Sequence, residues 1–538
     1  MNLCSSPSGS LSVSVSSEAA SALNTSGLES AGNRRFVKAI EAFQRASKLD
    51  PGAREPRLNL GVALAQAGEP AEALLQFEQV VERWPDYLEG RLNLAKALSA
   101  HHRHLDAIKA FRDALAIDPR CVDALNGLGL SLTHLGRARE ATIVLRQALR
   151  LDSRCAGGWS NLGFALATLA RYADAEAAFL AALRLSPSLP EAHVNRGNAL
   201  KEQGRIAEAI ACYDLAILLN ADAGSARWNR SLALLQNGDF DRGWEEYEAR
   251  WDRDGNARRR SYDAPTWDGR SPCGRTILVY SEQGLGDMVM FVRYAALLKK
   301  AGATVLLETP APLAAVMSSC PAIDRVFPEG SALPPVDAVV PAMSLPRLLH
   351  TRLDSIPADV PYLHADTTLV ARHRQRLAQL NGLTVGVIWQ GNPSHQWDRH
   401  RSVPLSSLAP LAQVPDIRLV SLQRGPGTEQ LSSCPFAIEE VIRDQPSESA
   451  AVADLAAWIA SVDLVVTVDT MPAHLAGAMA VPVWVMLSTM VDWRWMNDRL
   501  DSPWYPTMRL FRQRQRDQWE PVISEVASAL QLQLVGQH

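Results

Sequence analysis

Three short segments of this 538-residue chain combine polar side chains in patterns that suit chemistry on a bound ligand. The first runs from Glu282 to Asp287 and reads E-Q-G-L-G-D. Two glycines between a strand and a helix permit a tight turn and leave room for a ligand. The carboxylate of Asp287 then stands at a helix N-terminus, where it either faces that ligand or simply caps the helix. The third glycine of a dinucleotide fingerprint is absent, so this pattern alone indicates no particular ligand.

The second segment, Val468–His474, reads V-D-T-M-P-A-H and joins an expected strand to an expected helix. Pro472 suits the first turn of that helix, because an N–H group would have no partner there. The free amides of the turn favour an anionic ligand. The alternative is structural, with Asp469 or Thr470 capping the helix and His474 packed against it.

The third segment, Gln390–Ser402, follows a strand expected to end at Trp389 and carries several basic side chains. No lysine occurs after Lys300, so a phosphate bound in this half requires arginine, histidine or backbone amides. The candidates are Arg399, Arg401 and Arg424, because a planar guanidinium can bind two phosphate oxygens at once. The alternative for the segment is a polar surface loop.

Four aromatic residues crowd the segment 492–506, namely Trp493, Trp495, Trp504 and Tyr505. They form either a core or interdomain seam or an aromatic wall for a sugar or base. We favour the seam.

From Thr276 onward, short apolar runs alternate with helical patterns. Strands are expected at residues 276–281, 304–308, near 326, 336–340, 383–389, 417–422, 463–468 and 483–487. This alternation predicts parallel sheets that are covered on both faces. Because the alternation restarts near residue 383, we expect two such domains with a cleft between them and ligands at the carboxyl ends of the strands.

Small residues recur every 34 residues in the first half, at Gly61, Ala95, Gly129, Gly163, Gly197 and Ser231. An alanine position, a large apolar position and a turn position keep the same interval. This period with helical apolar spacing predicts tetratricopeptide repeats, in which antiparallel helix pairs stack into a superhelix. The small residue lets the two helices approach and the large one fills the gap. Such an array is expected to hold a protein partner.

We therefore predict an all-α tetratricopeptide superhelix followed by an α/β half. The expected segments are a disordered serine-rich leader (1–33), repeats (34–253), an irregular connector (254–275) and two sheet domains (276–380 and 381–538). The connector contains Arg258, Arg259 and Arg260. We assign this arginine run to a solvated or interdomain face rather than to a nucleic-acid patch.

Composition narrows the function classes. With a net charge of −4 and 21% charged residues, nothing marks a nucleic-acid or membrane-surface binder. The seven cysteines lack metal-ligand spacing, and their scattered positions fit a reducing compartment. No apolar stretch is long enough to span a bilayer, and no signal sequence precedes Cys4. We expect a cytoplasmic protein without a metal or other cofactor.

Taken together, the motifs of the second half resemble those of heptosyltransferase-like glycosyltransferases, here fused to tetratricopeptide repeats. The motifs are E-Q-G-L-G-D at 282–287, W-x-G-N at 389–392, R-S-x-P-L at 401–405, S-L-Q at 421–423, D-T-x-x-A-H-L-A-G at 469–477, and D-W-R-W through S-P-W-Y-P at 492–506. The resemblance covers about residues 34–538. It implies two Rossmann-like domains of the glycosyltransferase-B type that face a cleft.

In that family the aspartate of the glycine-rich turn is the general base on the acceptor, which implies this role for Asp287. The Asp-Thr turn with its histidine contacts the phosphates and sugar of the donor, which implies Asp469, Thr470 and His474. The resemblance further implies donor-binding roles at Gly284, Gly286, Gly391, Asn392, Arg399, Arg401 and Gln423. The basic phosphate-binding position falls among Arg399, His400 and Arg401 and cannot be aligned to one of them.

Two departures from the family pattern matter. Met471-Pro472 occupies a turn that usually contains small residues, which would narrow the donor site. The phosphate-binding lysine of heptosyltransferases is absent, so an ADP-heptose donor does not follow.

A row of asparagines shares one position of the repeat, two residues before the small one. The row comprises Asn59, Asn93, Asn161, Asn195 and Asn229 and is interrupted by Gly127. It resembles the asparagine ladder of O-GlcNAc transferase, whose amides bind an extended acceptor peptide. An amide both donates and accepts, so it can pair with any peptide backbone. The alternative is that these asparagines cap or bridge adjacent helices.

The function expected from this resemblance is transfer of a sugar from a nucleotide-sugar to a protein or peptide held by the repeats. Similar fusions glycosylate flagellin, which makes flagellin a reasonable acceptor. The first alternative is a transferase for a lipid-linked or polysaccharide acceptor. The second is a scaffold whose transferase half is inactive.

Overall fold

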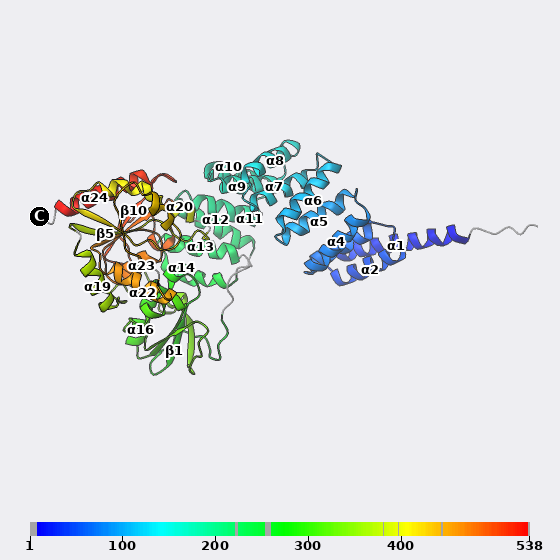
Figure 1. The fold of residues 1–538 in the computed structure, drawn as a ribbon. Helices are drawn as coiled ribbons and strands as arrows, with labels where there is room; N and C mark the ends of the chain where they lie inside the picture. Colours follow the sequence, from blue (N-terminus) through cyan, green and yellow to red (C-terminus); the bar gives the residue numbers. More distant parts are fainter. Residues whose placement is uncertain are drawn as a thin grey trace, which may run out of the picture. The chain divides into compact units, whose positions relative to one another are not determined.

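The computed structural model describes residues 8–220, 224–252, 260–379, 381–395, 398–442 and 445–535 (Figure 1). The chain divides into two compact units, Met1–Gln203 and Gly204–His538. Among the described residues, none of the helices combines the length and apolar character that a membrane span requires.

The first unit consists of helices arranged as antiparallel pairs, as the 34-residue period predicts. Its helices are α1 (Ser8–Gly32), α2 (Phe36–Leu49), α3 (Glu55–Gln66), α4 (Pro70–Arg83), α5 (Leu88–Ala100), α6 (His104–Ile117), α7 (Val122–His134), α8 (Ala138–Leu151), α9 (Ala156–Thr168), α10 (Tyr172–Leu185) and α11 (Pro190–Lys201). Each helix contacts its partner and the following pair.

The small residue that recurs in each repeat packs as predicted. A Cβ atom added to Gly61 would lie 2.6 Å from Cε1 of Phe77, and one added to Gly163 would lie 2.6 Å from Cε1 of Phe179. Both distances are too short for carbon atoms, so the rings occupy the space that the glycines leave. The two helices of a pair therefore approach closely enough to bury the aromatic ring completely.

The disordered leader is wrong for the part that the structure describes. Residues 8–32 form α1, which packs against α2 as the first helix of an additional pair. A Cβ atom added to Gly27 would lie 2.5 Å from Cε1 of Phe43. Gly27 precedes Gly61 by one full period, so the signal was present in the sequence but hidden among serines. Residues 1–7 lie outside the described part.

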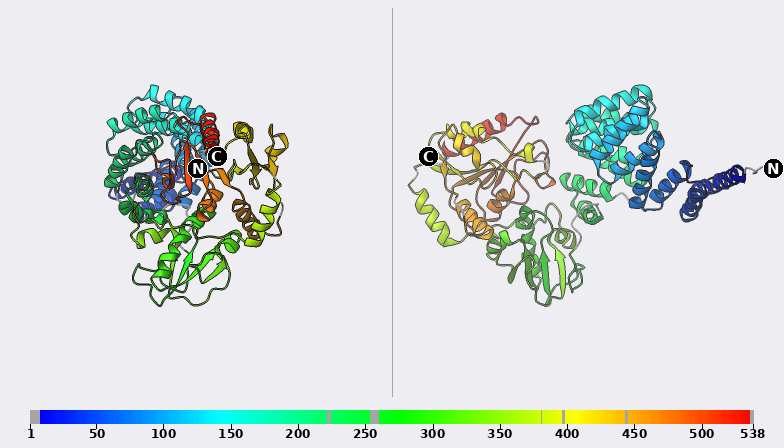
Figure 2. Two further views of the ribbon diagram at one scale, coloured as in Figure 1. Left: turned by 90° about the vertical axis from the view of Figure 1, so that its left-hand side faces the viewer. Right: turned by 45° about the vertical axis from the view of Figure 1, so that its right-hand side comes forward.

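The second unit begins with three helices and a short 3-10 turn: α12 (Ile206–Leu219), α13 (Gly224–Gln236), α14 (Phe240–Tyr247) and η1 (Glu248–Asp252). Two parallel sheets follow (Figure 2). The first contains β1 (Thr276–Tyr280), β2 (Thr304–Thr309), β3 (Arg325–Pro328) and β4 (Ala338–Pro341), in the order β3-β2-β1-β4. The second contains β5 (Leu383–Ile388), β6 (Ile417–Ser421), β7 (Glu439–Glu440), β8 (Leu464–Val468), β9 (Val483–Leu487) and β10 (Met508–Arg512), in the order β10-β9-β8-β5-β6-β7.

Alternate residues of the second sheet face different helices, as expected for strands buried on both sides. Val385, Val387 and Val466 pack with α21 (Ala409–Ala412) and α24 (Glu520–Val535). Val465, Val483 and Val485 lie in the opposite core with α22 (Glu448–Ile459) and α23 (Met471–Ala478).

The first sheet is covered differently on its two faces. One face packs on α15 (Leu285–Phe291), α16 (Ala295–Lys300) and α17 (Ala314–Met317). The other face, with Leu278 and Tyr280, packs on Tyr262 and Ala264 of the predicted connector. The described part of that connector is therefore a structural layer, pinned by the bond from the Trp267 amide to the Val339 carbonyl (2.8 Å). Residues 253–259 lie outside the described part.

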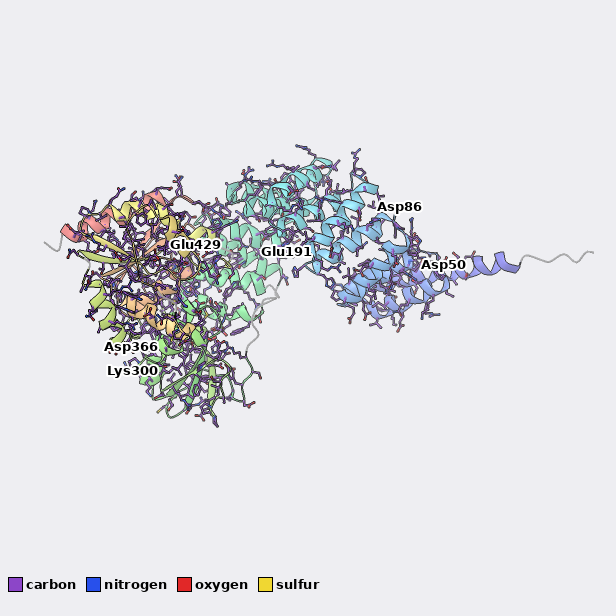
Figure 3. All side chains as sticks on the ribbon, viewed as in Figure 1. Asp50, Asp86, Glu191, Lys300, Asp366 and Glu429 are labelled. Atoms are coloured by element: carbon purple, nitrogen blue, oxygen red, sulfur yellow. The ribbon has the colours of Figure 1, made fainter. Side chains whose placement is uncertain are left out.

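Helix α19 (Thr367–Leu377), which we placed in the first sheet domain, packs against α22 of the second. His373 accepts or donates a bond with Asp454 (2.8 Å) and stacks on Trp458 with ring centres 3.7 Å apart. Asp366, labelled in Figure 3, caps the start of the helix, and its carboxylate accepts from the amides of Thr368 and Leu369. The boundary between the sheet domains thus lies before residue 366, not at 380.

The aromatic segment forms a seam, as favoured from the sequence. Trp495, Trp504 and Tyr505 are completely buried. Trp244 of α14 packs edge-on against Trp493, with ring centres 5.2 Å apart, and against Trp504. The final helices of the repeat region thereby share one core with the sheets.

Candidate active site

The candidate residues lie at the carboxyl ends of the central strands. When the strands of each sheet are numbered from one in chain order, the spatial order of the first sheet is 3-2-1-4. The spatial order of the second sheet, read from β7 to β10, is 3-2-1-4-5-6. In such sheets the crevice opens where the order reverses, which is between β1 and β4 and between β5 and β8. The three predicted segments follow β1, β5 and β8, so each begins at one of these positions.

Asp287 is both a helix cap and a site residue. It is the third residue of α15, and its Oδ2 accepts from the amide of Gly284 (3.0 Å). Its Oδ1 accepts from Nη2 of Arg494 (2.5 Å). The side chain is 20% exposed, so a ligand can still reach it. The capping role and an open carboxylate are therefore compatible.

Arg494, which sequence reasoning left out, is central to the site. It lies in the short turn η7 (Trp493–Trp495), and its Nη1 donates to Asp492 (2.8 Å) while Nη2 donates to Asp287. Burial alone would raise the pKa of Asp492, but the charge and hydrogen bonds of Arg494 lower it below the usual range. The sequence feature that could have identified Arg494 is its position between two tryptophans, Trp493 and Trp495.

His474 lies where the two sheet domains meet. A Cβ atom added to Gly286 would lie 3.1 Å from Cδ2 of His474, so the absent side chain of Gly286 makes room for the imidazole where α15 approaches α23. Nδ1 of His474 bonds with the hydroxyl of Tyr505 (3.0 Å). Burial, aided by the charge of Arg494, lowers the pKa of His474 to about 3. The imidazole is thus neutral at ordinary pH and cannot bind phosphate as a cation.

Asp469 directly follows β8 and is partly buried. Burial and the nearby charge of Asp492 raise the pKa of Asp469 to about 6. Its backbone carbonyl accepts from Nη1 of Arg401 (2.8 Å), while Nε of Arg401 donates to Asp398 (3.0 Å). Arg401 therefore ties the turn after β5 to the turn after β8, and these two bonds already occupy much of its guanidinium.

Arg399 is exposed and belongs to a basic cluster. Its Nε donates to Nε2 of His400 (2.9 Å), and Nη2 of Arg516 lies 2.7 Å from the same nitrogen. His400 Nδ1 bonds with Asp517, whose side chain is 61% exposed. Two guanidinium groups thus converge on one imidazole nitrogen, an arrangement that an anion would stabilise. Arg516 was missed because it lies 117 residues from Arg399, beyond β10.

Two other predicted donor residues shape turns. Gln423 is buried, and its amide is occupied by the backbone of Trp389, Gln390 and Pro426, so it braces the turn rather than contacts a ligand. Asn392 is exposed and accepts from the amide and hydroxyl of Ser394.

The remaining two predicted donor-binding residues, Gly391 and Thr470, each make one hydrogen bond that holds the backbone near their turn. The amide of Gly391 donates to Oγ of Ser402 (3.0 Å). Thr470 precedes α23, and its hydroxyl donates to the carbonyl of Val468 (3.2 Å).

A buried ion pair anchors the first segment from outside. Glu282 accepts from Nε and Nη2 of Arg250 (2.8 and 3.0 Å) and from the amide of Met343 (3.1 Å). Arg250 follows the last repeat helix, is 2% exposed and also donates to Ser344 after β4. The end of the repeat region thus holds the base of the turn that carries Asp287.

The asparagine row is half-buried, and two of its members bridge helices. Nδ2 of Asn59 donates to Oδ1 of Asn24 (3.0 Å), and Nδ2 of Asn161 donates to Oδ1 of Asn126 (2.8 Å). These bonds join first helices of neighbouring pairs across 35 residues.

The other three members of the row differ. Asn93 donates to the carbonyl of Glu89 within its own helix (2.8 Å). Asn195 and Asn229 lie at the same position in α11 and α13. The bridging alternative therefore accounts for Asn59 and Asn161, while peptide binding by the row stays a prediction.

Comparison with known proteins identifies the repeats and one curated relative. Tetratricopeptide-repeat family models match residues 26–87, 92–153, 138–190 and 190–222. Protein FlbA from Caulobacter vibrioides is 29% identical over 319 residues, which is 54% of this chain and 52% of FlbA. The chain thus spans about half the length of the curated relative it matches.

Solved structures are similar to part of this chain. The Cut9–Hcn1 hetero-tetramer of the APC/C is similar over 40% of this chain and 43% of that chain, with 20% identity and a TM-score of 0.38. A tetratricopeptide repeat protein from Parabacteroides merdae is similar over 43% of this chain and 91% of its own, with 16% identity and a TM-score of 0.38. The family models show that residues 26–222 are built from tetratricopeptide repeats.

Proposed function

We propose that this protein is a glycosyltransferase that moves a sugar from a nucleotide-sugar to a protein acceptor held by its repeats. The observation that carries the proposal is the convergence of Asp287, Arg494 and Asp492 at the ends of strands from two parallel sheets. Such strand ends are where ligands bind in sheets of this topology. The carboxylate and guanidinium groups there suit proton removal and phosphate chemistry.

In the proposed reaction Asp287 takes the proton of an acceptor hydroxyl. The hydroxyl oxygen then forms a bond to the anomeric carbon of the sugar, and the bond from that carbon to the nucleotide diphosphate breaks. The partly exposed carboxylate suits this role because Gly284 and Arg494 fix its orientation without enclosing it.

The diphosphate is proposed to bind near Arg399 and Arg516, at the end of the donor-side sheet. This choice follows from the contacts of the alternatives: Arg401 is tied to Asp398 and Asp469, and His474 is neutral. The two converging guanidinium groups supply the positive charge that the missing lysine would give.

The acceptor is proposed to be a protein because tetratricopeptide repeats bind protein segments. Flagellin, the acceptor suggested by resemblance, is the first protein to test. A scaffold without transfer is the second candidate, because both carboxylate oxygens of Asp287 already have donors within the chain.

The test measures release of the nucleotide from UDP-, GDP-, ADP- and CMP-linked sugars, with water or flagellin as acceptor. Asp287→Asn should slow release from the active donor by about 10²–10⁴-fold, since asparagine keeps the shape but not the basicity. Asp366→Asn, a cap substitution on exposed α19, is the matched control and should leave the rate unchanged.

Two results would redirect the proposal. If no donor is consumed by the natural chain, the scaffold takes the place of the enzyme. If a donor is consumed equally fast by the Asp287→Asn variant, the transferase stands but its base is another residue.

A further inference from the structure

A guanidinium held between two carboxylates links the two sheet domains. Arg494 donates from Nη2 to Asp287 (2.5 Å) and from Nη1 to Asp492 (2.8 Å). Its side chain is 10% exposed, and its guanidinium carbon lies 4.3 Å from the centre of the Trp493 ring. Asp287 follows the first strand of one sheet, whereas Asp492 and Arg494 lie between the last two strands of the other.

The arrangement fixes Asp287 from both sides. The Gly284 amide holds one carboxylate oxygen, and Arg494 holds the other. A guanidinium is a planar fork, so a second carboxylate on its opposite arm fixes its angle as well as its position. Asp492 is that second carboxylate, and it also accepts from the Arg494 amide (3.0 Å).

We propose that Arg494 is a positioning residue that acts in sugar transfer through Asp287 and does not bind the donor. The inference rests on the proposed function, because it assigns a partner to the base of that reaction. Its two terminal nitrogens are directed at carboxylates, which leaves the phosphate contacts to the separate cluster of Arg399 and Arg516.

A nearby arginine, Arg512, holds the same segment in place and provides a control for a purely structural role. Arg512 donates to the carbonyls of Trp495, Met496 and Arg499, at 2.5, 2.9 and 2.8 Å. It therefore anchors the same segment as Arg494, but through backbone carbonyls and not through either carboxylate. Arg512→Met is the matched control for loosening of this segment.

The experiment is a kinetic double-mutant cycle of natural chain, D287N, R494M and the double variant. The readout is kcat for hydrolysis of whichever of the four nucleotide-sugars the natural chain consumes fastest. We expect R494M alone to lower kcat by about 10²-fold, and to lower it by less than about threefold in the D287N background. R494K, which keeps the charge but not the fork, should fall between R494M and the natural chain.

Binding of UDP, GDP, ADP and CMP by calorimetry completes the test. The affinity of R494M for the nucleotide that binds should stay within about twofold of the natural value. Thermal melting identifies variants that fail to fold, and R494K then replaces R494M in the cycle.

Each opposing result overturns a defined part. Multiplicative losses in the double variant, an equal loss in R512M, or nucleotide binding weakened tenfold in R494M would each overturn the positioning role while the transferase stands. A natural chain that consumes none of the donors would overturn the proposed function itself, and the role of Arg494 would fall with it.

Discussion

Two aspartates of the site behave oppositely because of what surrounds them. Burial and the charge of Asp492 raise the pKa of Asp469 to about 6. Asp492 is paired with Arg494, which lowers its pKa despite burial. The sequence shows two aspartates of one type, whereas the structure separates one that holds its proton up to about pH 6 from one that ionises more readily than usual.

Asp469→Asn should therefore stabilise the protein as pH rises. The unfolded carboxyl releases its proton near pH 3.8 and the folded one near 6, so rising pH favours unfolding of the natural chain across this window. Asparagine has no proton to release. Thermal melts should show equal pH dependence below about pH 4 and a gain of roughly 1–2 kcal/mol above about pH 7, allowing for partial exposure.

Asp492→Asn supplies the opposite sign. Its folded pKa is lowered, so its stabilisation is present above the unfolded value of 3.8 and disappears as pH falls. The Asp492→Asn variant should be less stable than the natural chain at pH 7.

The Asp469 prediction has its own contradicting outcome. A stability difference between Asp469→Asn and the natural chain that does not change with pH would show that Asp469 ionises normally.

At the scale of elements, the helix pairs depend on one contact between a small residue and a large one. In α9, a Cβ atom added to Gly163 would lie 2.6 Å from Phe179 of α10. A Cβ atom added to Gly157, in the same helix, would lie 3.6 Å from Nδ2 of Asn126, which is an ordinary contact distance. The packing of this helix therefore requires glycine at position 163, whereas position 157 has room for a methyl group.

Gly163→Ala should lower stability by about 1–2 kcal/mol, because the pair must open to admit the methyl group. Alanine already occupies this position at Ala95, so the cost stays below that of a rigid overlap. Gly157→Ala is the matched control and should be neutral or stabilising by about 0.5–1 kcal/mol. Urea denaturation of both variants tests the pair, and equal effects would contradict the packing role of the small position.

At the scale of the whole molecule, the end of the repeat region belongs to the sheet-bearing unit. Trp244 is buried among Trp493 and Trp504, and Arg250 is buried against Glu282. The compact unit accordingly starts at Gly204 and not at the connector. The predicted boundary at 253 cuts through this shared core.

A fragment of residues 204–538 should fold cooperatively, whereas a fragment of residues 254–538 should not. The shorter fragment leaves Glu282 without its buried partner, which costs about 3–5 kcal/mol, and exposes the seam once covered by Trp244. Circular dichroism and thermal melts of both fragments check this. Cooperative melting of the shorter fragment at the same temperature would show that the last helices merely rest on the sheets.

The sequence by itself determined the periodic features of this protein. The 34-residue interval predicted the helix pairs, and strand–helix alternation predicted two parallel sheets with candidate segments at strand ends. These features are local, because side chains along a helix or a strand return to the same face every few residues. The sequence reading missed α1, because its serine-rich composition concealed Gly27, and it placed no element at β7, β10 or α24.

The tertiary structure alone decided which charges meet. Asp287 and Arg494 are 207 residues apart, and Arg250 and Glu282 come from different kinds of element. No local period encodes such pairs, because strand order and domain packing bring them together. The same holds for Gly286, whose missing side chain makes room for His474 from the other sheet domain, and for Gln423, which proved to brace a turn.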